Sequence, residues 1–301
     1  MEVVTVGRVY HKGYNLKLRY LKQKETCGDG SFGTCYKIIL VEKGSGIVRI
    51  NSSRYIFTAP CAFCLNELED ISFGDTGSIS LRTICFQPEV INKVFNYSNV
   101  NQKPRQLSGL DFDDTYLLRI FTVRTSAYLG LLNIGPSSLK RIVSIFNLIS
   151  LELEEQRDVD WPCRSRSFLF ELLIVLQRIF LEGQPIDNIA VSEKYPEIAE
   201  IILYLHTNYM NKITVAEISR KFNINRTTLG TQFIEVTGLT VIAYLIKLRL
   251  DLAEMLLRDT LLPIAEIYER VGFSDRTHFG RTFSKHTGCT PSEYRKKYCW
   301  M

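Results

Sequence analysis

The C-terminal third of this chain contains the same stretch of sequence twice, and this repeat constrains the fold more than any other feature. The tripeptide Ala216-Glu217-Ile218 recurs as Ala265-Glu266-Ile267, which lies 49 positions later. Further along the offset becomes 50, and the matched pairs are Arg226-Thr227 with Arg276-Thr277, Gly230 with Gly280, Phe233 with Phe283, Thr237-Gly238 with Thr287-Gly288, and Thr240 with Thr290. Self-similarity at a fixed period indicates a structural unit that occurs more than once.

The change of offset locates a turn inside each copy. The extra residue lies in a stretch that reads Asn223-Ile224-Asn225 in the first copy and Gly272-Phe273-Ser274-Asp275 in the second. Both versions of this stretch contain turn-forming residues. Because the identity continues on both sides of a turn of variable length, we expect two helices joined by a short connection in each copy. The sequence therefore predicts two helix-turn-helix units, at about residues 212–236 and 262–286.

Helix start signals and apolar spacing define the rest of this region. Thr214-Val215-Ala216-Glu217 and Thr290-Pro291-Ser292-Glu293 both fit the capping box, in which the threonine hydroxyl and the glutamate carboxylate satisfy free amides at a helix start. Residues 241–257 place valine and leucine three and four positions apart, which predicts a linking helix. Its 17 positions span roughly 26 Å. With the widths of the flanking units, this length can place two recognition helices about one DNA turn apart, on the order of 34 Å.

The second helix of each unit is the predicted DNA-reading element. In a helix-turn-helix this helix enters the major groove, and its outward residues near the N-terminus contact base edges. Leu229 and Phe233 in the first copy, and Phe279 and Phe283 in the second, are expected to point inward. The residues presented on the opposite faces are Arg226, Thr227, Gly230 and Thr231 in the first copy, and Arg276, Thr277, Gly280 and Arg281 in the second.

The two predicted reading faces differ in strength. Arginine in the second copy can donate two hydrogen bonds to guanine or one to phosphate. The first face has shorter side chains and less charge, so we expect it to contribute less base readout. The alternative interpretation is two ordinary helical hairpins with solvated arginines.

Residues 1–182 follow a different pattern. Tyr36–Glu42 and Ile47–Asn51 flank a glycine-containing turn and predict a β-hairpin, and further strand runs at 54–58 and 78–86 end before prolines. Many short strands indicate an all-β barrel or sandwich. Helical spacing then predicts helices over 137–155 and about 164–181. The chain is therefore expected to be α+β, with residues 1–182 as one domain, 183–195 as a linker and 196–301 as an all-α domain.

Composition excludes several classes of protein. The net charge of +5 permits nucleic-acid binding without establishing it. No apolar run is long enough to span a bilayer, and the first residues lack the apolar block of a secretory signal, so we expect a cytoplasmic protein. The eight cysteines are widely and irregularly spaced and are expected to be reduced.

Metal and catalytic signatures are weak. Cys61-Ala62-Phe63-Cys64 has no second CxxC and no nearby histidine, so we predict buried strand residues rather than a zinc site, and a redox switch stays open as an alternative. His11 is the only histidine in the strand-rich segment. We therefore expect no metal, no cofactor and no enzyme activity.

The repeat region resembles the signature of the AraC/XylS family of bacterial transcriptional regulators. The matching segments are Ile264-Ala265-Glu266-Ile267, Val271-Gly272-Phe273, Phe279-Gly280-Arg281-Thr282-Phe283, and residues 287–295, which read TGCTPSEYR. Tyr244-Leu245 and residues 248–253 fit the linking helix of that family, and the match covers about residues 196–298. The resemblance implies two helix-turn-helix subdomains, binding to promoter DNA, and usually activation through contact with RNA polymerase.

The family's base-contacting positions fall on the same residues that periodicity selects, apart from Arg226. The sequence departs from many relatives at Thr231, where an arginine is common, and at Gly230 and Gly280, where glycine occupies a reading position. A glycine offers no side-chain donor and weakens a helix by about 1 kcal/mol relative to alanine. Strong readout by the first unit is therefore not expected.

The N-terminal half is similar to that family only in layout. Strands followed by two helices resemble a cupin-like half that binds an effector and forms a dimer. The candidate effector-binding residues are Tyr36, Ile38, Phe57 and Phe63, with plain core residues as the alternative. The candidate dimerisation residues lie on one helical face, with packing on the barrel as the alternative, and are Ile142, Ile145, Phe146, Ile149 and Leu153.

The sequence thus favours a sequence-specific DNA-binding regulator, an activator, that forms a homodimer and responds to a small effector. One rival hypothesis is an effector-responsive sensor that acts mainly through protein partners. Another is a cupin-type enzyme with a fused regulatory tail. The operator, the regulated genes and the effector are not encoded in any recognisable pattern.

Overall fold

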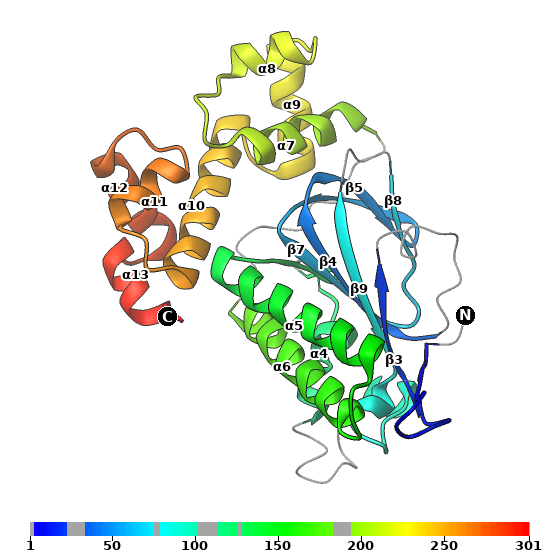
Figure 1. The fold of residues 1–301 in the computed structure, drawn as a ribbon. Helices are drawn as coiled ribbons and strands as arrows, with labels where there is room; N and C mark the ends of the chain where they lie inside the picture. Colours follow the sequence, from blue (N-terminus) through cyan, green and yellow to red (C-terminus); the bar gives the residue numbers. More distant parts are fainter. Residues whose placement is uncertain are drawn as a thin grey trace. The chain divides into compact units, whose positions relative to one another are not determined.

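The computed structural model describes residues 3–22, 34–74, 79–101, 114–125, 128–182 and 194–300. Cys27 and residues 183–193 of the predicted linker lie outside the described residues. Contacts divide the chain into two units: the first comprises residues 1–44, 59–134 and 138–184, and the second comprises residues 45–58, 135–137 and 185–301. The chain thus contains an N-terminal sheet region and a C-terminal helical region (Figure 1).

The main sheet has five antiparallel strands in the order β10-β7-β4-β9-β3. Its strands are β3 (Leu18–Lys22), β4 (Tyr36–Lys43), β7 (Cys61–Leu65), β9 (Ser80–Phe86) and β10 (Leu131–Asn133). The central strand β4 is buried on both faces over its first six residues, which include Lys37 and the apolar run Ile38-Ile39-Leu40-Val41. β1 (Thr5–Val6) and β2 (Asn15–Leu16) form a separate ladder.

The predicted hairpin between residues 36–42 and 47–51 is wrong. β4 pairs with β7 and β9, whereas β5 (Ser45–Ile50) pairs with β6 (Ser53–Thr58) in a three-stranded sheet of order β6-β5-β8, where β8 is Ile71–Phe73. The physical reason lies at the end of β4. The β4–β9 register is irregular between Val41 and Lys43, and Gly44 has a φ of +104°, so the chain leaves the main sheet at the expected turn.

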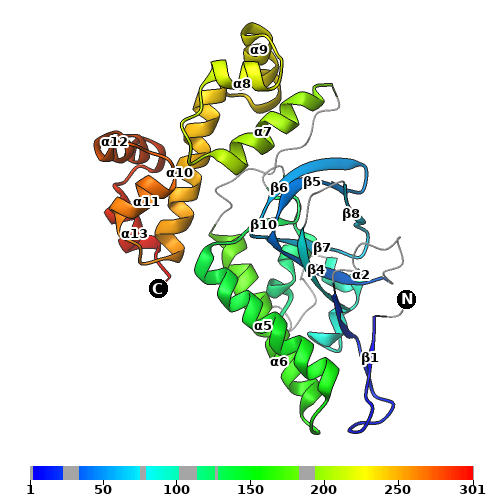
Figure 2. The same cartoon turned by 45° about the horizontal axis from the view of Figure 1, so that its top comes forward.

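Short helices follow β9, and two long helices end the N-terminal region. The short elements are η1 (Pro88–Val90), α2 (Tyr97–Asn101) and α4 (Arg119–Thr122). The long helices α5 (Pro136–Glu155) and α6 (Trp161–Leu181) lie side by side (Figure 2). The five residues proposed for dimerisation are all buried on α5 within the chain. They therefore pack in the interior of the single chain and are not on its surface. The exposed apolar residues of α5 are Leu148 and Leu151.

The second unit contains seven helices from residue 196 onward. They are α7 (Pro196–Asn208), α8 (Val215–Lys221), α9 (Arg226–Thr237), α10 (Val241–Asp259), α11 (Ile264–Arg270), α12 (Arg276–Thr287) and α13 (Pro291–Tyr298). Of the helices that the structure describes, none taken singly has the length and apolar character to cross a membrane, and the one pair that has them, α9 with α10, is bent by 45°.

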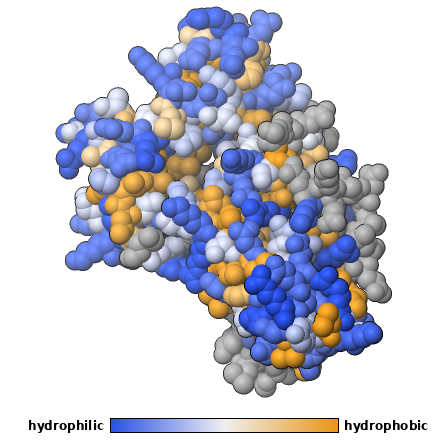
Figure 3. All heavy atoms as spheres, viewed as in Figure 1, coloured by the Kyte–Doolittle hydropathy of each residue, from blue (hydrophilic) through white to orange (hydrophobic). Residues whose placement is uncertain are grey.

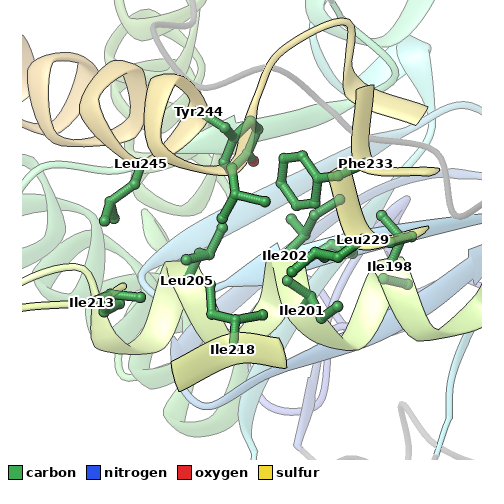
Figure 4. Close-up of a cluster of buried hydrophobic side chains, with 13 residues drawn as sticks. Ile198, Ile201, Ile202, Leu205, Ile213, Ile218, Leu229, Phe233, Tyr244 and Leu245 are labelled. Atoms are coloured by element: carbon green, nitrogen blue, oxygen red, sulfur yellow. The ribbon is translucent and has the colours of Figure 1, made fainter. Parts of the chain in front are cut away.

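Two apolar cores share the linking helix α10. The first joins α7, α8 and α9 to the N-terminal half of α10, through residues such as Leu205, Phe233 and Leu245 (Figure 4). The second joins α11, α12 and α13 to the C-terminal half of α10, including Leu250 and Leu257. Each helix pair therefore has its own core, and one continuous helix connects them.

The turns inside the two helix pairs explain the change of offset in the repeat. Residues 222–225 connect α8 to α9, and residues 271–275 connect α11 to α12, which is one residue longer. Asn223 and Gly272 adopt positive φ angles of 51° and 87° in these turns. A Cβ atom at position 272 would lie 2.5 Å from the Tyr209 carbonyl oxygen, so only glycine fits there. The structure thus contains a helix pair in each copy of the repeat, as predicted.

Candidate nucleic-acid interface

The two candidate reading helices begin at side-chain caps. The Asn225 side chain accepts a hydrogen bond from the Thr227 amide at the start of α9, and the Asp275 side chain accepts one from the His278 amide at the start of α12. Both helices end at a left-handed glycine, Gly238 with φ of 72° and Gly288 with φ of 79°. These caps fix where each helix starts and stops.

The two predicted capping boxes differ in the structure. At α13 the box is complete, because Thr290 accepts from the Glu293 amide and the Glu293 carboxylate accepts from the Thr290 amide. At α8 only half of it forms. Thr214 accepts from the Glu217 amide at 3.2 Å, but the Glu217 carboxylate accepts the Tyr204 hydroxyl of α7 at 3.1 Å. Glu217 therefore ties α8 to α7 instead of closing the cap.

The inward faces of both reading helices are buried as predicted. Leu229 and Phe233 of α9 and Phe283 of α12 are fully inaccessible, and Phe279 is nearly so. In the second pair the Phe279 ring lies edge-on to the Phe273 ring, with centroids 5.2 Å apart. This packing leaves the opposite face of each helix toward solvent.

The eight predicted DNA-contacting residues lie on those outer faces. The two glycines, Gly230 and Gly280, are partly exposed. The other six are exposed, and they are Arg226, Thr227, Thr231, Arg276, Thr277 and Arg281. In the part of the chain that the structure describes, Arg276 and Arg281 form no ion pair with a carboxylate, so their guanidinium groups are available to an anionic ligand. The surface over α11 and α12 is mainly hydrophilic (Figure 3).

Sequence reasoning missed one position on each face. Ile234 lies four residues after Gly230, and Ser284 lies four residues after Gly280, which places both on the outward side of their helices. Ile234 is 45% exposed. The prediction stopped at the N-terminal residues of each helix. The same spacing of three and four residues, continued for another turn, would have found both positions.

A polar cluster joins the second pair to the linking helix. His286 Nε2 lies 3.3 Å from both Asp251 Oδ1 and Glu254 Oε1. The other carboxylate oxygens are engaged by Lys247 Nζ at 2.8 Å and by the Tyr294 hydroxyl at 2.9 Å. The potential ligand atoms of this cluster lie within 4.8 Å of one another. Because a lysine already neutralises the buried carboxylate, we interpret it as an ion-pair network rather than a metal site.

A histidine also lies at a buried contact between α7 and the linking helix. His206 Nε2 and the Tyr244 hydroxyl are 2.6 Å apart, between α7 and α10. Burial and, to a smaller extent, the nearby Lys247 lower the pKa of His206 to about 4. His206 is therefore neutral at physiological pH and serves as a packed, hydrogen-bonded core residue.

The four candidate effector-binding residues do not share one surface. Tyr36 and Ile38 lie on the same face of β4, and the Tyr36 ring stacks on Phe121 with centroids 4.8 Å apart. Phe63 of β7 is directly opposite Ile39, so it points to the other face of the sheet. Phe57 belongs to β6, which is in the three-stranded sheet. All four are buried, so the alternative of core residues fits them better.

The CxxC segment lies within strand β7. Cys61 and Cys64 are both buried free thiols. Burial raises the pKa of Cys64 to about 12, although Arg124 partly opposes the shift. Residues three apart in a strand point to opposite faces, so this pair does not face one another. The geometry matches the predicted role as small buried strand residues.

Comparisons with known proteins include a family model whose match lies within the second unit. A family model described as a helix-turn-helix domain matches residues 218–297. An uncharacterised HTH-type transcriptional regulator, YdiP of Escherichia coli (strain K12), is 30% identical over 157 residues, which is 52% of this chain and 52% of the relative. The HTH-type transcriptional activator RhaR of Cronobacter sakazakii is 24% identical over 264 residues, which is 87% of this chain and 84% of the relative.

This chain thus spans about half the length of the first relative and most of the second. Among solved structures, the C-terminal domain of AraT, a response regulator from Geobacillus stearothermophilus, is 28% identical with a TM-score of 0.35. That match covers 36% of this chain and 92% of the AraT domain.

Proposed function

We propose, because the chain belongs to the AraC/XylS family of transcriptional regulators, that it is a sequence-specific DNA-binding regulator that activates transcription. The observation that carries the proposal is the pair of reading helices. α9 and α12 bury equivalent apolar residues in separate cores and turn equivalent polar residues outward. Two such helices on one chain can enter successive stretches of the major groove.

Affinity and specificity would come from different contacts. Lysine and arginine contacts to phosphate supply affinity that falls with salt and carry no sequence information. Base readout is proposed to come from the outer faces. Arg281 on α12 is a candidate, as is Arg276, because both are exposed, unpaired with any described carboxylate and able to bind guanine in bidentate fashion. Promoter DNA is the partner proposed from these contacts, and RNA polymerase is the partner that the family resemblance implies for an activator.

The N-terminal region is proposed to regulate this binding. We place a small effector in the strand-rich region, in a cupin-like arrangement of its sheets, and a homodimer contact on the same half of the chain. RhaR, to which the chain is similar over most of its length, is named as a transcriptional activator.

The proposal is tested by selecting bound DNA from a random pool, with and without cell extract, using the full chain. An enriched sequence gives the site and its half-site spacing, and dependence on extract reveals an effector. Arg281→Ala should then reduce binding to the selected duplex by about tenfold or more while changing binding to random DNA little.

The matched control is Lys140→Ala, which removes one positive charge from an exposed position on α5. It should leave the ratio of specific to random binding unchanged. Equal losses on both kinds of DNA for Arg281→Ala would contradict direct base readout, and a pool without any enriched sequence would contradict the proposed function itself.

A further inference from the structure

The outward side of α9 has an unusual chemistry for a DNA-reading helix. Residues that recur at three, four and seven positions lie on one face of a helix. On α9 this outer strip consists of Thr227, Thr231, Ile234 and Glu235, all of them exposed. Arg226, which is also exposed on α9, lies outside this strip. The four strip residues include no cation, and the central one is a branched aliphatic side chain that is 45% exposed.

Two polar side chains of the α9 outer strip, those of Thr231 and Glu235, are engaged within the protein. The Thr231 hydroxyl donates to the Thr227 carbonyl oxygen at 3.1 Å, which leaves the Thr231 methyl group for contact with a ligand. The Glu235 carboxylate accepts from Lys194 Nζ at 2.6 Å and from the Tyr195 hydroxyl at 2.8 Å. Its negative charge is therefore paired, and Thr231 and Ile234 offer methyl groups to the outside.

The equivalent outer strip of α12 has the opposite character. It consists of Thr277, Arg281, Ser284 and Lys285. The last three occupy the positions of Thr231, Ile234 and Glu235 of α9, in that order. Arg281 and Lys285 are exposed cations, and Arg281 has no described carboxylate partner. The repeat has thus kept its fold while its two reading surfaces have diverged in chemistry.

The major groove offers one chemical match to each strip. Thymine alone among the bases carries an apolar group there, its 5-methyl, which side-chain methyl groups can contact. Guanine presents two acceptors, O6 and N7, which a single arginine can bind together. Apolar side chains gain nothing from phosphate, so an exposed isoleucine on a groove-facing helix fits a base methyl better than any backbone group.

We propose that the two reading helices recognise chemically different half-sites, with α9 contacting thymine methyl groups through Ile234 and Thr231, and α12 contacting guanine through Arg281. A half-site here means the base pairs under one reading helix. This inference rests on the proposed function and adds to it the chemical class of each target. It also revises the expectation that the first unit reads little, because a methyl-bearing strip reads by apolar contact.

The test uses the duplex enriched from the random pool. Arg281→Ala assigns the α12 half-site as the positions whose base preference is lost, and the other half-site then belongs to α9. Deoxyuridine replaces thymine in one half-site at a time, which removes only the 5-methyl group. The affinity should fall by about fourfold for each contacted methyl in the α9 half-site and little in the α12 half-site. Replacing guanine with 7-deazaguanine should show the reverse pattern.

Variants connect the methyl effect to named side chains. Ile234→Ala should weaken binding to the thymine duplex and remove its sensitivity to deoxyuridine. The matched control is Ile174→Ala on α6, an isoleucine that is 55% exposed in the N-terminal region and should change neither property. Thermal unfolding of each variant verifies that the fold is unchanged, and Ile234→Val, which keeps methyl groups, should retain part of the sensitivity.

The outcomes separate this inference from the proposed function. Deoxyuridine sensitivity confined to the α9 half-site and lost in Ile234→Ala supports it. An enriched site with guanine contacts under both helices, or equal deoxyuridine sensitivity in wild type and Ile234→Ala, would overturn the inference and leave the proposed function standing. A pool without enrichment would overturn both.

Discussion

Gly230 and Gly280 occupy the same position in the two reading helices, and neither is required by packing within the protein. A Cβ atom added at either position would meet no atom within 4 Å. Glycine in a helix interior is about 1 kcal/mol less favourable than alanine, because it loses more backbone freedom on folding. The sequence therefore holds a destabilising residue at both equivalent positions, beside the faces proposed to meet DNA. We infer that the missing side chain lets the helix backbone approach the groove closely.

Gly280→Ala should therefore separate stability from binding. We expect the free energy of unfolding to rise by about 0.5–1 kcal/mol, because the substitution fits an open helical site. Affinity for the selected duplex should fall, because the new methyl group stands between helix and DNA. Urea unfolding and fluorescence anisotropy at one salt concentration measure the two effects. Thr228→Ala on α9 is the control for helix propensity alone, and stronger binding by Gly280→Ala would contradict the idea of close approach.

At the scale of residues, the sequence predicts the direction in which a side chain points better than the group that the side chain contacts. The helical period correctly separated inward from outward residues, because one face of each helix must be buried in a core. It did not reveal what polar side chains would bind. Glu217 fits a capping box by spacing, yet its carboxylate accepts the Tyr204 hydroxyl of another helix. A neighbour supplied by tertiary packing has no signal in the local sequence.

At the scale of elements, the two reading helices are fastened to α10 in different ways. Near its C-terminal end α12 carries His286, which contacts the carboxylates of Asp251 and Glu254. The equivalent position of α9 is Val236, which packs on the first apolar core. A cation near a helix C-terminus is also favoured by the helix dipole. The second pair thus depends on a charge-assisted contact where the first depends on apolar burial.

This difference predicts a pH dependence confined to the second pair. The hydrogen bond to Asp251, opposed by partial burial, raises the pKa of His286 above its ordinary value of 6.5. Glu254 adds to the increase and Lys247 opposes it, while the Tyr294 hydroxyl faces the same cluster from α13. A raised folded-state pKa means that the stabilising contribution is complete below 6.5 and is lost as the pH rises through the folded-state pKa.

Hydrogen exchange of α12, corrected for its intrinsic pH dependence, should therefore show less protection as the pH rises above 6.5, while α9 shows no such change. In His286→Gln the additional dependence should disappear, and α12 should be less protected at low pH by less than about 1 kcal/mol. His278→Gln, which alters an exposed histidine of the same helix, is the control. An identical pH profile in wild type and His286→Gln would refute the role of this contact.

Strand pairing was the least predictable feature at this scale. The glycine-containing segment after β4 has the local signature of a hairpin, but both neighbours of β4 begin later in the chain, at Cys61 and Ser80. The alternation of faces had a similar consequence for the candidate effector residues. Tyr36 and Phe63 are both buried aromatics of adjacent strands, yet the register places them on opposite faces of the sheet. Local patterns identify strands, whereas register and order depend on distant partners.

At the scale of the whole molecule, the repeat and the linking helix were predictable from sequence because both are periodic. The relation between the two reading helices follows from α10. This helix contributes its N-terminal half to one core and its C-terminal half to the other. Its 19 residues span about 28 Å. Because α10 is continuous and packed at both ends, the separation of the two reading helices within one chain is fixed.

A fixed separation makes a sharp prediction about half-site spacing. Inserting five base pairs, about half a helical turn, between the half-sites rotates one of them to the opposite side of the DNA. Affinity should then fall to that of a duplex with one half-site scrambled, as measured by anisotropy at constant salt.

Inserting ten base pairs, about one full turn, restores the rotation but adds about 34 Å of length. One chain cannot follow that change, because α10 cannot lengthen without breaking both cores. Binding should therefore stay weak at ten base pairs. If the affinity recovers with ten inserted base pairs, the two half-sites are read by separate chains, because only reading helices on different chains can move apart by a full turn of DNA.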